Sequence, residues 1–157
     1  IGGIAIAVFV FAIGSTKYIG LGIPIIEASF SQQMLPYDFA IKVILTAFTL
    51  GAGFKGGEVT PLFFMGATLG SALFLILPLP MSLLAGMGFV AVFAGATKTP
   101  LACIIMGLEL FGMEGFVFIS IACVVAYFTS GQTSVYSSQN KSLLKSKIYS
   151  AFKSKLN

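Results

Sequence analysis

The chain of 157 residues contains no histidine, arginine or tryptophan, and it has only two cysteines, Cys103 and Cys123. Without histidine, no serine–histidine or cysteine–histidine pair can form, so the residue types exclude hydrolytic triad chemistry. Two isolated cysteines are too few for the usual transition-metal ligand sets. Both lie in apolar runs, and we expect them to be small buried packing residues instead of a disulfide or reactive pair. We therefore expect no catalytic residues, no metal, no cofactor and no enzyme activity.

Charge is scarce as well. Charged residues make up 9% of the chain, whereas a soluble domain carries about 25%. Apolar residues make up 57%, and the mean hydropathy is +1.02. A chain with so few charges could not cover a surface that faces water, so we expect lipid to surround it. The composition predicts an all-α, multi-pass membrane protein.

The apolar blocks are mostly shorter than the roughly 20 residues that a membrane-spanning helix needs. Only the block from Pro61 to Leu79 reaches that length by itself, and we expect Pro61 to open a long helix that Pro78 and Pro80 close. The shorter blocks predict broken or tilted helices, which persist at membrane depth only where protein or a water-filled cavity surrounds them. These shorter blocks are Ile4–Ile13, Phe39–Leu50, Leu83–Ala96, Leu101–Phe111 and Phe116–Phe128.

The net charge of +4 is a property of the C-terminal end, because five of the nine lysines lie after residue 140. We expect residues 135–157 to form an amphipathic basic helix. A basic segment that follows a membrane span usually stays in the cytoplasm, so we place the C-terminus there. Since these lysines flank a span instead of covering a folded surface, we expect no nucleic-acid partner. Lys42, near the start of another apolar block, is expected to extend its amine to the membrane surface.

The first residue is Ile1, and an apolar run begins at once. This run has neither a basic leading region nor a small-residue cleavage site, so we do not interpret it as a signal peptide. We expect the chain to be part of a longer protein whose N-terminal half is missing here.

The stretch Gly56-Gly57-Glu58-Val59-Thr60-Pro61 has the features of an anion-binding turn. Thr60 is a good N-cap, and Pro61 suits the first position of a helix. The glycines allow a ligand to approach the backbone closely. The free N–H groups and the positive dipole end of a helix then bind an anion without a basic side chain. The alternative is an ordinary loop that caps a helix at the membrane surface.

Two further side chains could act on an anion: Glu58, within this turn, and Tyr136, where a polar turn meets the last predicted helix. A carboxylate inside a membrane readily takes up a proton, because desolvation disfavours its charged form, so Glu58 is a candidate proton carrier. The alternative is a solvated Glu58 at the headgroup boundary. The hydroxyl of Tyr136 is a neutral donor that could reach an anion. Its alternative role is that of an interfacial tyrosine.

Four stretches, in their order along the chain, together resemble the CLC family of chloride channels and anion/proton antiporters. Gly57–Pro61 resembles the anion-binding turn that begins helix N of that family, and Gly88–Ala96 resembles helix O. Thr99–Gly112 resembles helix P, and Ser134–Tyr136 resembles the approach to helix R, where a tyrosine faces the central anion.

The resemblance implies an all-helical fold of two inverted repeats with broken and tilted helices, of which this chain would be the second repeat. Residues 1–134 would form the transmembrane anion-transport domain from about helix J to helix Q. Residues 135–157 would form the final pore-lining helix and the basic cytoplasmic end. The resemblance also implies a homodimer with one pore per subunit, formed through residues 100–130 together with N-terminal helices. A prokaryotic cell membrane is the expected location.

Glu58 and Thr60 depart from most members of the family, which have apolar residues at these positions. The sequence Gly-Glu-Val-Thr-Pro is similar to that of the fluoride/proton antiporter branch. By this resemblance the anion would contact Gly57, Glu58, Val59, Thr60 and Tyr136, and Glu58 would also handle a proton. The partners would be fluoride or chloride, protons and the lipid bilayer. A chloride channel or chloride/proton antiporter is the alternative within the family, and a membrane scaffold subunit without a pore is the alternative of another class.

Overall fold

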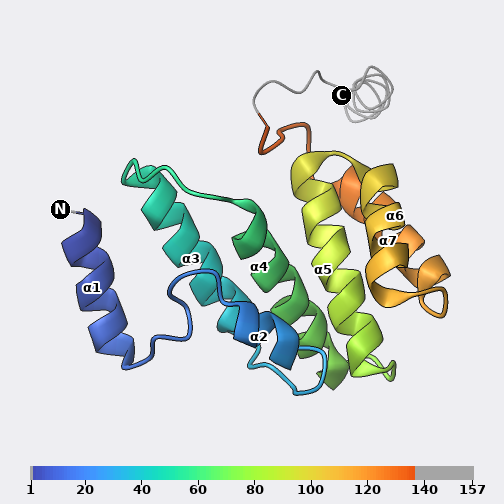
Figure 1. Ribbon diagram of the computed structural model, residues 1–157, viewed down its shortest axis with the longest axis horizontal. Helices are drawn as coiled ribbons and strands as arrows, with labels where there is room; N and C mark the ends of the chain where they lie inside the picture. Colours follow the sequence, from blue (N-terminus) through green and yellow to red (C-terminus); the bar gives the residue numbers. More distant parts are fainter. Residues whose placement is uncertain (1, 137–157) are drawn as a thin grey trace, which may run out of the picture.

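The computed structural model describes residues 2–136 of the chain, and within this range it is helical with no strand. The all-α class expected from the composition is therefore confirmed. The helices α3, α4 and α5 lie side by side, α1 lies against the outer side of α3, and α6 and α7 lie beyond α5 (Figure 1). The elements are α1 (Gly2–Ile13), α2 (Ile23–Ala28), α3 (Asp38–Gly51), α4 (Val59–Ala72), the 3₁₀ turn η1 (Leu73–Leu75), α5 (Met81–Thr97), α6 (Pro100–Phe111) and α7 (Phe116–Thr129).

Most of the predicted helices agree with the structure, but the helix expected to run from Pro61 to the prolines at 78 and 80 is shorter than predicted. Helix α4 ends at Ala72 and tightens into η1. The stretch Pro78-Leu79-Pro80 follows, and prolines disfavour helix both at their own position and at the residue before them. None of the helices described within residues 2–136 is long and apolar enough to cross a membrane.

Helices α4 and α5 approach each other unusually closely, through glycines on both sides. A Cβ atom added at Gly66 would lie 2.9 Å from the Cα of Phe89, and one added at Gly70 would lie 2.9 Å from the Cα of Ala85. A Cβ at Gly88 would in turn overlap the carbonyl oxygen of Gly66. The four-residue spacing of small residues thus lets the two backbones touch, which is how helices without a hydrophobic driving force between them pack in lipid.

The second half of the described chain packs around α5. Its buried cluster consists of Val90 and Ala94 from α5, Cys103 from α6, and Ile119 and Cys123 from α7. Both cysteines are free and buried, which confirms the expectation that they are packing residues. This cluster and the glycine contact with α4 hold α5 on opposite sides, so α5 is the central helix of the described part.

The glycine contact generates a prediction about stability. We expect Gly70→Ala to lower the free energy of unfolding by about 2 kcal/mol, because its methyl group would force α4 away from α5. Gly51→Ala, at the end of α3, is the matched control, since a Cβ there meets nothing within 4 Å. The thermal unfolding midpoint of the two variants in detergent measures the difference, and equal midpoints would contradict the role of Gly70.

Candidate functional site

The candidate anion-binding turn lies where the loop of residues 52–58 enters α4. The helix begins at Val59 with Glu58 as its N-cap, and its first hydrogen bond runs from the N–H of Leu62 to the carbonyl of Glu58 at 3.3 Å. The predicted cap at Thr60 is therefore wrong by two residues: Thr60 and Pro61 lie inside the first turn. Pro61 is tolerated there because the N–H groups of the first turn have no carbonyl partner within the helix. The same free N–H groups and the positive dipole end point out of the helix towards the loop.

The residues of the turn leave room for a ligand. Gly57 is exposed, whereas Glu58, Val59 and Thr60 are half-buried. A Cβ added at Gly56 or Gly57 would meet nothing within 4 Å. Glu58 is thus not fully enclosed by this part of the chain, and no hydrogen bond or ion pair of its carboxylate is recorded within residues 2–136.

A cavity of about 320 Å³ opens beside the turn and extends between α1 and α3. Gly56, Gly57 and Pro61 line it on the side of the turn, and Lys42 lines it from α3. The expectation that Lys42 reaches the membrane surface is wrong, because its side chain is only 3% exposed. Sequence reasoning missed this residue as part of the site. A single lysine within the apolar block Phe39–Leu50 was the available signal, since ionisable residues inside a membrane are seldom incidental.

A buried polar cluster fixes the segment between α1 and α2 against α3. Asp38, fully buried at the start of α3, accepts hydrogen bonds from Tyr18 Oη at 2.7 Å and from the N–H of Leu35 at 3.1 Å. Lys17 Nζ forms an ion pair with Asp38 Oδ2 at 2.6 Å. Burial, together with the hydrogen bond to Asp38, raises the pKa of the Tyr18 hydroxyl above its usual range, so Tyr18 remains a neutral donor. The cluster thereby positions Tyr18 and its neighbours in the wall of the cavity.

Tyr136 is not joined to the turn by any hydrogen bond of the described residues. Its side chain is 45% exposed, and its N–H donates to Ser134 Oγ at 3.2 Å. The segment is held to the end of α5 instead, because the N–H of Val135 donates to the carbonyl of Ala96 at 3.0 Å. Val135 and Tyr136 are not helical, and the rest of the predicted final helix, residues 137–157, lies outside the described residues.

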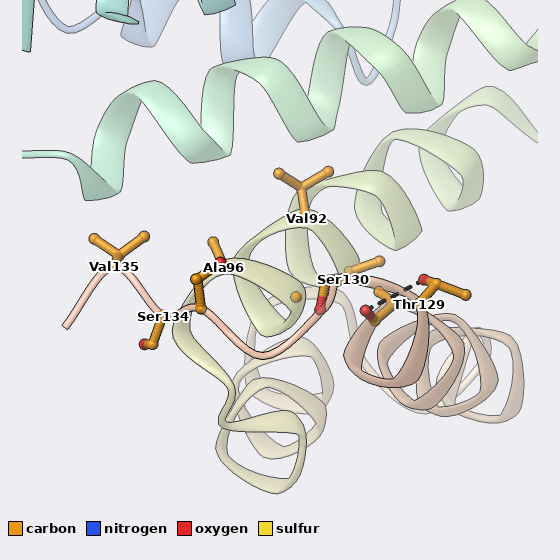
Figure 2. Close-up of a pocket in the computed structure, with 10 residues that line it drawn as sticks. Val92, Ala96, Thr129, Ser130, Ser134 and Val135 are labelled. Atoms are coloured by element: carbon orange, nitrogen blue, oxygen red, sulfur yellow. Dashed lines mark hydrogen bonds between the residues drawn. The ribbon is translucent and has the colours of Figure 1, made fainter. Parts of the chain in front are cut away.

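A second hollow of about 510 Å³ lies between α5, α7 and the segment that contains Val135 (Figure 2). No charged side chain lines it. The hydroxyl of Thr129 donates to the carbonyl of Val125 at 2.9 Å, and that of Ser130 donates to the carbonyl of Tyr127 at 3.2 Å. The hydroxyl of Ser134 also donates to a backbone carbonyl, that of Thr97 at 3.3 Å, so three of the four hydroxyls that line the hollow are already engaged.

The chain is similar to known proteins along most of its length. Residues 1–131 match the family model described as voltage gated chloride channel. A chloride/fluoride channel protein from Pseudomonas syringae pv. tomato is 56% identical over 144 residues, which are 88% of this chain and 32% of that protein. The crystal structure of a CLC-type fluoride/proton antiporter matches with a TM-score of 0.84 and 42% identity, over 90% of this chain and 36% of the other. The chain thus spans about a third of the length of each of these proteins.

The polar cluster at Asp38 generates a prediction. We expect Asp38→Asn to lower the free energy of unfolding by about 2 kcal/mol, because the charged acceptor of two side chains and one backbone N–H is lost. Glu27→Gln on α2 is the control, since Glu27 is exposed. A lower thermal unfolding midpoint for Asp38→Asn alone is the expected result, and an unchanged midpoint would show that the cluster does not hold this segment.

Proposed function

Because the chain belongs to the voltage gated chloride channel family, we propose that it forms the second repeat of a membrane transporter that exports fluoride in exchange for protons. The observation that carries the proposal is the turn Gly57–Thr60, which places free N–H groups, a hydroxyl and a carboxylate at the N-terminus of α4 beside a cavity. Fluoride is named for both relatives and a proton for the antiporter, which supports the same assignment. A membrane location follows from the family.

In the proposed site the anion binds at the start of α4. The amides of Gly57, Glu58 and Val59 and the hydroxyl of Thr60 are the donors, and the helix dipole adds favourable charge. Fluoride is small and strongly hydrated, so it leaves water only where several donors replace its hydration shell. Thr60 supplies a donor that an apolar residue at this position could not. Tyr136 is proposed as a further donor, contributed by the segment that follows α7.

Glu58 is proposed to carry the proton. Its carboxylate repels an anion bound at the adjacent amides while it is charged, and it can donate a hydrogen bond to the anion once it is protonated. Proton and anion occupancy are then coupled by electrostatics over a short distance.

Exposed apolar side chains support the proposed surroundings of the chain. Leu101, Ile105, Val117, Ile121 and Val125 on α6 and α7 are more than half exposed in the isolated chain. We propose that lipid and a second subunit cover this surface, with residues 100–130 in the dimer interface together with helices of the N-terminal half. Residues 1–134 would belong to the transport domain and residues 135–157 to the last pore-lining helix. The proposed location is a prokaryotic cell membrane with the C-terminus in the cytoplasm.

Chloride transport, as a channel or as a chloride/proton antiporter, is the second candidate, favoured by the chloride in the name of the Pseudomonas relative. Anion flux from liposomes that contain the full-length protein separates the candidates. We expect fluoride efflux to be several-fold faster than chloride efflux. Equal rates would contradict the fluoride assignment and support the second candidate. Absence of flux for both anions would contradict transport and favour a scaffold role.

The role of Glu58 has its own test. We expect Glu58→Gln to abolish proton uptake driven by a fluoride gradient, because glutamine cannot bind and release a proton. Glu114→Gln, in the exposed turn between α6 and α7, is the control and should retain uptake. A pH-sensitive dye outside the liposomes measures the effect, and unchanged uptake in Glu58→Gln would rule out this carboxylate as the proton carrier.

A further inference from the structure

Lys42 is a buried cation in the wall of the cavity that the candidate anion-binding turn also lines. Thr46 and Thr49 line the same cavity, and their spacing from Lys42 corresponds to one face of α3. The polar face of α3, which is otherwise apolar, therefore lines the same cavity as Gly56 and Gly57. A positive charge on Lys42 would therefore attract an anion that approaches the start of α4 through this cavity.

Three contacts hold the amine of Lys42 in the interior. Its Nζ donates to the carbonyl of Tyr18 at 2.9 Å and to that of Gly20 at 2.8 Å. It also lies 5.0 Å from the centroid of the Phe64 ring, over its face. Carbonyl oxygens and aromatic faces are both attractive to an ammonium group.

No carboxylate neutralises this ammonium within residues 2–136. Asp38, one turn earlier on α3, forms its ion pair with Lys17 instead. A buried charge costs free energy unless it is paired. The hydrogen bonds to the two carbonyls compensate part of this cost. A neutral side chain such as an amide could have donated to the same carbonyls without a charge. The presence of a lysine at this buried position is therefore the feature that needs an explanation.

We propose that Lys42 is a positioning residue for the transported anion: its fixed positive charge raises anion occupancy of the cavity and of the adjacent turn. This inference rests on the proposed function. Lys42 does not touch the anion in this role, because its Nζ remains bound to the two carbonyls. It acts through the low-dielectric space between α3 and the turn, where water screens a charge weakly.

Anion transport by the full-length protein in liposomes tests the proposal through a separation of affinity from maximal rate. We expect Lys42→Gln to raise the fluoride concentration for half-maximal flux about ten-fold, since loss of one nearby unscreened charge is worth on the order of 1.4 kcal/mol. Lys42→Arg, which keeps the charge, should stay within about two-fold. An unchanged half-maximal concentration in Lys42→Gln, or equal impairment of Lys42→Arg and Lys42→Gln, would overturn the proposal.

The matched control for burial is Lys55→Gln. Lys55 lines the same cavity but is exposed, so water screens its charge, and we expect a shift of less than about two-fold. A shift as large as that of Lys42→Gln would contradict the specific role of the buried lysine.

A second pair of variants keeps the test decisive if Lys42→Gln fails to fold. Thr46→Glu and Thr46→Gln place side chains of equal size beside Lys42, and only the first opposes its charge. We expect Thr46→Glu to raise the half-maximal fluoride concentration relative to Thr46→Gln, and equal values would overturn the electrostatic role. If the unmodified protein transports no anion, the proposed function itself fails, which is a different result from transport that is insensitive to charge at these positions.

Discussion

The close contact between the backbones of α4 and α5 is the constraint on which the rest of the described structure depends. Gly66, Gly70 and Gly88 have no side chains to separate the two helices. Because α4 is held in this way against α5, the N-terminus of α4 has a defined position. The loop of residues 52–58 must join the end of α3 to that position. The donors of the candidate site thus lie on a rigid helix end, although the residues before them belong to a loop.

The other wall of the site is held by polar contacts. Asp38 joins Lys17 and Tyr18, while Lys42 joins the carbonyls of Tyr18 and Gly20. In an apolar environment such bonds are maintained, because a separated partner would remain without water. The two halves of the cavity are therefore built differently: shape complementarity places α4, and buried hydrogen bonds place the segment between α1 and α2.

In the proposed mechanism the two walls of the cavity would act on the anion in different ways. The amides and hydroxyl at the start of α4 would contact the anion directly, whereas Lys42 would act through its charge alone. Glu58, the N-cap of α4, would carry the proton. A fixed cation and a carboxylate that takes up a proton would together make anion entry depend on the proton.

The sequence by itself determined the all-α class, most helix positions and the packing role of the cysteines, because these follow from residue types and local spacing. It misplaced the start of α4 by two residues and its end by several, since neighbouring glycines and prolines allow more than one helix boundary. Only the tertiary structure decided that Lys42 is buried beside the turn. That outcome depends on α3 and the segment around Tyr18 and Gly20 meeting across the cavity, and no pattern within a single helix specifies such a meeting.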